Sequence, residues 1–119
     1  MVGKGFTGIA TDSRLTEVTS FTDEILGQLP YHLADGVNDY GIKVSEHILY
    51  NDDFKMPTGS NTLTRLPYDI LTTCKTINDV VLMDFENYYI PQQLWDYCLQ
   101  FLVSDGTTTK VITPSESGY

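Results

Sequence analysis

The sequence predicts an α+β fold, a mostly helical small domain with a short β-sheet and extended arms at its N- and C-terminal ends. Three observations predict it. Apolar residues recur at helical spacing in three segments, two short segments are rich in β-branched residues, and both ends of the chain lack a hydrophobic period. With 119 residues, 41% of them hydrophobic and 19% charged, the chain has the composition of one globular domain with a single core.

The two ends of the chain are predicted to be extended. Residues 1–20 contain Gly3, Gly5, Gly8 and several threonines, and residues 113–119 are mainly polar. Such segments are either mobile ends or segments that become ordered against a partner. The chain therefore divides into an N-terminal arm (1–20), a globular domain (21–112) and a C-terminal tail (113–119).

A first helix is expected over residues 21–29. Ser20 or Thr22 can cap its N-terminus, and Pro30 closes the segment. The apolar residues that recur at helical spacing are Phe21, Ile25, Leu26 and Leu29.

A longer helix is expected over residues 32–50, although Gly36 and Gly41 each disfavour it by about 1 kcal/mol. The residues of its apolar face are Leu33, Val37, Tyr40, Val44 and Ile48. The alternative is a strand in which Ile42, Val44, Ile48 and Tyr50 alternate with polar residues. Glu46 would then face the core, so the helix is the preferred interpretation.

A turn-rich loop and a strand are expected next. Residues 51–61 hold Asn51-Asp52-Asp53 and Pro57-Thr58-Gly59-Ser60-Asn61, which favour turns. Residues 79–85 are short, contain the β-branched Val80 and Val81, and are flanked by asparagines, which is typical of a strand.

The last elements are predicted to be a helix and a strand. Pro91 suits the first position of a helix over 91–103, whose apolar face would hold Ile90, Leu94, Trp95, Cys98, Phe101 and Leu102. Gly106 fits just past that helix, and the β-branched residues of 107–113 predict a final strand that Pro114 ends.

Composition argues against several classes of function. The longest apolar stretches have four or five residues, far fewer than the roughly 20 that cross a bilayer, and the N-terminus has no apolar signal segment. A net charge of −9 opposes binding to phosphate backbones. Cys74 and Cys98 both occupy apolar patterns and are expected to be reduced and buried. We therefore expect a cytoplasmic protein that binds neither membranes nor nucleic acid directly.

No motif for catalysis or for a cofactor is present. The sequence contains neither a nucleophile elbow nor a phosphate-binding loop, and His32 and His47 have no zinc ligands at suitable spacing. Asp84 and Glu86 would share one face of the strand at 79–85, where solvated carboxylates are the ordinary interpretation. The sequence therefore predicts a protein that is not an enzyme and has no cofactor or metal.

Residues 35–46 match a calcium-binding loop in part. Asp35, Asp39 and Glu46 fall at positions 1, 5 and 12 of that pattern. Position 3 is Val37 and position 6 is Tyr40, so one ligand and the turn glycine are missing. A calcium-binding module is a lesser alternative.

Aromatic residues suggest a surface for protein contacts. The chain has eight tyrosines, five phenylalanines and one tryptophan, and such side chains are enriched at interfaces as well as in cores. Several of them crowd together between residues 88 and 97. The candidate interface residues are Phe6, Ile9, Tyr88, Tyr89 and Tyr119.

Residues 66–97 resemble the head-to-tail adaptor family of tailed bacteriophages, the tail tubular protein A-like proteins. The segments that carry the resemblance are Leu66-Pro67-Tyr68-Asp69-Ile70-Leu71, Asp79 to Glu86, and Ile90-Pro91 followed by Leu94 and Tyr97. In that family a Leu-Pro-x-Asp turn precedes a strand, and an Asp-Phe-Glu-x-Leu-Pro segment leads into the last helix. The chain has four residues between Glu86 and Pro91, where the family's pattern has two, and lacks the family's tryptophan-rich segment.

The resemblance implies a non-enzymatic virion component, such as a head-to-tail connector ring subunit that is assembled in the host cytoplasm. Its implied partners are portal or tail proteins and copies of itself. Extended arms fit that role, because ring subunits exchange them with their neighbours. The alternative is a small acidic binding module or inhibitor that occupies a basic site on a partner protein.

Overall fold

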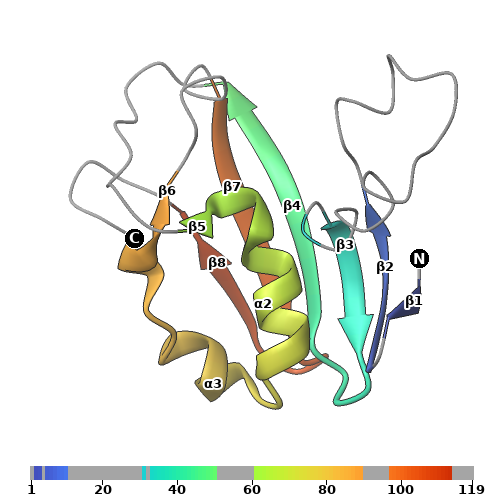
Figure 1. Cartoon of the computed structure of the whole chain (residues 1–119). Helices are drawn as coiled ribbons and strands as arrows, with labels where there is room; N and C mark the ends of the chain where they lie inside the picture. Colours follow the sequence, from blue (N-terminus) through green and yellow to red (C-terminus); the bar gives the residue numbers. More distant parts are fainter. Residues whose placement is uncertain are drawn as a thin grey trace, which may run out of the picture.

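The computed structural model describes residues 2–3, 5–10, 31, 33–50, 61–89 and 97–113. A six-stranded antiparallel sheet dominates this part of the chain, with the strand order β1-β2-β3-β4-β7-β8 (Figure 1). Its strands are β1 (Val2–Gly3), β2 (Phe6–Ala10), β3 (Leu33–Asn38), β4 (Lys43–Tyr50), β7 (Tyr97–Ser104) and β8 (Thr109–Ile112).

The connection from β4 to β7 carries the helical elements. Helix α2 (Leu66–Thr73) packs on β3 and β4, and the short α3 (Ile77–Val81) follows it on the same side of the sheet (Figure 1). The smaller elements are β5 (Asn61–Thr62), the 3₁₀ turns η3 (Leu63–Arg65) and η4 (Phe85–Asn87), and β6 (Tyr88–Tyr89), which pairs in parallel with β5. The prediction of a mostly helical domain is therefore wrong.

The predicted helix over 32–50 is a β-hairpin. Strands β3 and β4 pair antiparallel, and Gly41, with a φ of +82°, lies in the turn that joins them. The period-two alternative describes β4, in which Lys43 points to solvent and Val44 to the core, and Ile42, just before the strand, is also buried. Glu46 does lie on the core side, where it is half-buried, and burial raises its pKa to about 7. Because the Glu46 carboxyl group can take up a proton near neutral pH, the strand can place it on the core side without burying a charge.

The predicted helix over 91–103 is also wrong where the structure describes it. Residues 97–104 form β7, in which Leu99, Phe101 and Val103 alternate as buried residues. The apolar Leu102 between them lies on the opposite face of the sheet. Because it is apolar, it interrupts the alternation of apolar and polar residues and makes the segment fit a helical period. The residues at 90–96 and the helix expected at 21–29 lie outside the described residues, as does most of the loop at 51–61. The strand predicted over 107–113 is confirmed as β8.

The strand predicted over 79–85 is replaced by the end of α3. The Thr76 hydroxyl accepts a hydrogen bond from the backbone N–H of Asp79, and the Asp79 carboxylate accepts one from the backbone N–H of Thr76. This capping box starts the helix at Ile77 despite the β-branched residues that follow. Hydrogen bonds from the backbone N–H groups of Lys75 and Thr76 lower the pKa of Asp79.

The N-terminal segment predicted to be an arm contributes two strands. Strand β2 pairs with β3 along its whole length, and Phe6 is 6% exposed in the core. The ring of Phe6 meets that of Tyr68 on α2 edge to face, with 5.9 Å between ring centres. This part of the arm belongs to the folded domain.

One close approach fixes the helix on the sheet. A Cβ atom at Gly36 would lie 2.6 Å from Cδ1 of Leu71, so only glycine leaves room for α2 at this distance. Gly8 lies directly opposite Gly36 on β2, and a Cβ there would lie 2.7 Å from the carbonyl oxygen of Asp35. Gly36 thus allows α2 to lie close to β3, and Gly8 allows β2 to lie close to β3.

A buried asparagine joins the end of α2 to the hairpin. The amide nitrogen of Asn38 donates hydrogen bonds to the carbonyl oxygens of Leu71 (3.2 Å) and Cys74 (2.7 Å). Its side-chain oxygen accepts hydrogen bonds from the backbone N–H groups of Tyr40 and Ile42, both at 3.0 Å. Asn38 thus satisfies two carbonyl groups that the end of the helix leaves unpaired, and it also satisfies two backbone N–H groups in the turn of the hairpin.

Candidate interaction surface

The side of the sheet away from α2 and α3 forms the open face. A side chain at position 36 would point towards Leu71 on the helix. Because side chains alternate along a strand, the neighbouring Asp35 and Val37 point away from the helix. The strand register extends this face across the sheet. Its members are Thr7, Ile9, Asp35, Val37, Lys43, Ser45, His47, Gln100, Leu102, Ser104, Thr109, Val111 and Thr113.

Aliphatic and hydroxyl side chains dominate the open face. Ile9, Val37 and Val111 are exposed there to 65%, 36% and 53%. Among the described residues of this face, the formal charges are those of Asp35 and Lys43, which cancel, whereas the whole chain carries a net charge of −9. The open face is therefore an electrically balanced, partly apolar surface on an acidic protein.

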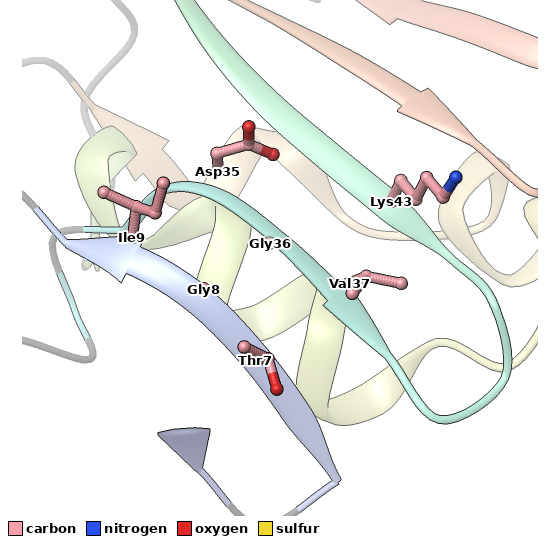
Figure 2. Close-up of a pocket in the computed structure, with 7 residues that line it drawn as sticks. All are labelled: Thr7, Gly8, Ile9, Asp35, Gly36, Val37 and Lys43. Atoms are coloured by element: carbon pink, nitrogen blue, oxygen red, sulfur yellow. The ribbon is translucent and has the colours of Figure 1, made fainter. Parts of the chain in front are cut away.

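A shallow depression of about 400 Å³ lies on the open face between β2 and β3. Figure 2 shows the backbone of Gly8 and Gly36 along the strands between its lining side chains. The side chains that line it are those of Thr7, Ile9, Asp35, Val37 and Lys43. A side chain at position 36 would point towards Leu71 on the helix side, so the hollow on the open face is the space between the flanking side chains of Thr7, Ile9, Asp35 and Val37.

The predicted interface residues are not brought together by the fold. Ile9 lies on the open face, but Phe6 points into the core, and Tyr88 is 5% exposed. Tyr89 is half-buried in β6, and Tyr119 lies outside the described residues. Of the five, Ile9 is the described residue that the structure places on an exposed apolar surface.

Tyr88 has a structural partner. Its hydroxyl donates a hydrogen bond to Asp69 on α2, and Nε of Arg65 donates another to the same carboxylate over 3.1 Å. Burial, followed by the hydrogen bond to Asp69, raises the pKa of Tyr88. The guanidinium carbon of Arg65 lies 4.6 Å from the ring centre of Tyr31 and 5.6 Å from that of Tyr68. This network holds the start of α2 against β6.

The polar residues singled out in the sequence are dispersed or engaged locally. Asp35 and Glu46 lie on opposite faces of the sheet, so the calcium-like pattern is not assembled. The Asp84 carboxylate accepts hydrogen bonds from the backbone of Glu86 and the side chain of Asn87, in a 3₁₀ turn rather than a strand. Within the described part of the chain, no three His, Cys, Asp or Glu residues lie close enough to hold a metal ion.

The remaining candidates show no shared site. His47 bonds Ser45 through Nε2 over 3.0 Å on the open face, and His32 lies outside the described residues. Cys74 is buried, and burial raises the pKa of its thiol. The side chain of Cys98 also lies outside the described part.

Sequence reasoning missed Val37, Lys43 and Val111 as surface residues of one face. The signal available in the sequence is the alternation of apolar and polar residues at 42–45, which is typical of a strand with one covered side and marks Lys43 as exposed, whereas Val37 and Val111 lie outside that stretch. The register that brings the three residues together depends on pairings between distant segments.

No protein-family model and no curated protein sequence matches this chain. None of the helices described here has the length and apolar character needed to cross a membrane.

Proposed function

We propose that this protein is a non-enzymatic structural subunit that assembles with copies of itself through the open face of its sheet. The observation that carries the proposal is the character of that face. The helices α2 and α3 lie on the other side of the sheet, and the described residues of the open face are partly apolar and have no net formal charge. Exposed apolar surface of this kind is typical of protein contact sites.

Electrostatics favour this face over the rest of the surface. Two copies with a net charge of −9 repel each other, and the repulsion is weakest where the facing surfaces are neutral. Removing Ile9, Val37 and Val111 from water also stabilises the complex, at about 25 cal/mol for each Å² of apolar surface buried.

The size of the face limits the affinity. The members of the open face come from five of the six strands, β2, β3, β4, β7 and β8. Strands about 4.8 Å apart, each about six residues long with a rise of about 3.3 Å per residue, give roughly 500 Å² per copy. A standard interface buries about 800 Å² per partner. We therefore expect association in the micromolar range rather than a permanent dimer.

The resemblance over residues 66–97 supports a narrower form of the proposal. In this form the proposed assembly belongs to a bacteriophage virion, as a head-to-tail connector component that meets portal or tail proteins and is assembled in the host cytoplasm. This form predicts that the purified chain binds a portal or tail protein of its phage as well as itself.

Analytical ultracentrifugation of the full chain from about 1 to 500 µM tests self-association in the range expected for a small interface. Ile9→Lys places a charge on the open face and should weaken association. Val81→Lys is the matched control, because Val81 is 54% exposed at the end of α3, on the other side of the sheet. Both positions are exposed, so neither change should alter stability by more than about 0.5 kcal/mol.

The acidic binding module remains the second candidate, favoured by the net charge of −9. It predicts a monomer at every concentration and salt-sensitive binding to a basic partner. A wild-type chain that stays monomeric to about 500 µM, beyond the affinity expected for this face, would overturn the assembly proposal.

A further inference from the structure

Resting on the proposed function, we propose that the open face binds the same face of a second copy about a two-fold axis, with Asp35 of each copy against Lys43 of the other. The contact is isologous: one surface supplies both halves of the interface. This inference names the partner and the alignment of the interface, which the assembly proposal leaves open.

The register of β3 and β4 provides the geometry. Asp35 pairs with Ser45 and Val37 pairs with Lys43, so these four residues lie at the corners of an approximate rectangle on the open face. Asp35 and Lys43 lie at the ends of one diagonal, and Val37 and Ser45 at the ends of the other. Rotation of a second copy about an axis along the Val37–Ser45 diagonal places each Asp35 close to the position opposite a Lys43.

The charges fit this arrangement. In the part of the chain that the structure describes, Asp35 and Lys43 form no ion pair with each other, and both are exposed. Figure 2 shows the Asp35 side chain on β3 and the Lys43 side chain on the neighbouring strand β4. Face-to-face pairing gives each charge an opposite partner and makes two equivalent ion pairs in one interface.

The other diagonal fits as well. An axis over Val37 and Ser45 brings Val37 against Val37 and Ser45 against Ser45 of the second copy, an apolar pair and a hydroxyl pair. Val37 also lines the depression, so the hollow between β2 and β3 lies beside the axis and can receive side chains of the second copy. An interface with this symmetry closes as a dimer, and a larger ring would need a second, different surface.

Charge reversal tests the pairing in the full-length chain. Asp35→Lys and Lys43→Asp should each weaken the dimer about tenfold or more, because like charges then face each other. The double variant Asp35→Lys/Lys43→Asp should restore the dissociation constant to within about threefold of wild type, because both ion pairs re-form with reversed signs.

Matched controls carry the same charge changes away from the open face. Glu86→Lys lies in the exposed η4 turn, and Lys110→Asp lies on the core side of β8, opposite Val103. Both should leave the dissociation constant close to wild type. Chemical denaturation of every variant checks that the fold is retained.

Thiol cross-linking tests the axis itself. Facing sheets pack about 10 Å apart, which is too far for a direct disulfide. Val37→Cys should therefore give covalent dimers with a short bis-maleimide cross-linker whose reach matches that spacing, since the two cysteines meet at the two-fold axis. Val111→Cys is the control, because Val111 is more exposed than Val37 but lies two strands beyond β4. Wild-type protein runs alongside, because the chain contains Cys74 and Cys98.

The outcomes separate the inference from the proposal on which it rests. If Ile9→Lys weakens association but neither charge reversal does, or if Val37→Cys cross-links no more than wild type, the two-fold pairing is overturned and assembly through the open face stands. If the wild-type chain is monomeric throughout, both are overturned. Weaker association of both single charge-reversal variants, with recovery of the dissociation constant in the double variant, supports both the two-fold pairing and the assembly proposal.

Discussion

Glu46 lies directly opposite Phe101 across the β4–β7 pair, on the face of the sheet that carries the core. Phe101 is fully buried, and Glu46 is half-buried beside it. Burial disfavours the charged form of a carboxyl group and raises the pKa of Glu46 from 4.5 to about 7. Below pH 4.5 the side chain is protonated in both the folded and the unfolded chain.

This relationship predicts a stability that falls as pH rises from about 4.5 to about 7. Within that window the folded protein holds a proton that the unfolded chain releases, so the free energy of unfolding decreases with pH and then levels off. The loss is at most about 3 kcal/mol, and less to the extent that water reaches the carboxyl group. Glu46→Gln should remove this dependence and stabilise the protein at pH 8.

Urea unfolding at pH 5, 6, 7 and 8 measures the effect for wild type and Glu46→Gln. Glu86→Gln is the matched control, because Glu86 is exposed and should leave the pH profile unchanged. Parallel profiles for wild type and Glu46→Gln would show that Glu46 ionises normally.

Asn38→Ala should destabilise the protein by about 2–4 kcal/mol. The change leaves two carbonyl oxygens and two backbone N–H groups without their side-chain partner in a buried place. Asn38→Asp should also destabilise at pH 7, because a carboxylate cannot donate hydrogen bonds to the carbonyl oxygens of Leu71 and Cys74. Denaturant melts measure both, with Asn78→Ala in the exposed part of α3 as the control. A loss below about 0.5 kcal/mol for Asn38→Ala would contradict this role.

Gly36→Ala should cost about 1–3 kcal/mol, because its Cβ would meet Cδ1 of Leu71 at 2.6 Å and the backbone oxygen of Thr7 at 3.0 Å. Part of this cost comes from Leu71, so it should shrink when the change is made in a Leu71→Ala background. A double-mutant cycle from thermal or denaturant unfolding measures that coupling. Additive effects would show that the helix does not depend on this close approach.

Tyr88→Phe should destabilise by about 1–2 kcal/mol, because it removes a hydrogen bond to the Asp69 carboxylate while keeping the buried ring. Tyr40→Phe is the control, since Tyr40 is exposed in the hairpin turn. Equal stabilities of the Tyr88 variant and wild type in urea melts would mean that Asp69 is held by Arg65 alone.

Local chemistry determined several features that the sequence alone could predict. The β-branched residues after Gly106 identify β8, and the hydrophobic content of the chain predicts one core. The capping box of Thr76 and Asp79 was equally local and readable, although the neighbouring Val80 and Val81 favoured a strand. Such features depend on residues within a few positions of one another, so composition and spacing suffice to predict them.

Tertiary structure decided the fold class and the open face. Residues 33–48 fit a helical period through Leu33, Val37, Tyr40 and Val44, and a strand period through Ile42 and Val44, so the local pattern supports both. Residues 43–50 form a strand because they pair with β7 along their whole length. Glu46 stays on the core side of that strand, where burial raises its pKa. Leu102 similarly obscures the alternation of β7, because the face to which it belongs is set by register and not by its own segment. Pairing between distant strands therefore determined which residues share a surface, and periodicity along a single segment contains no information about that pairing.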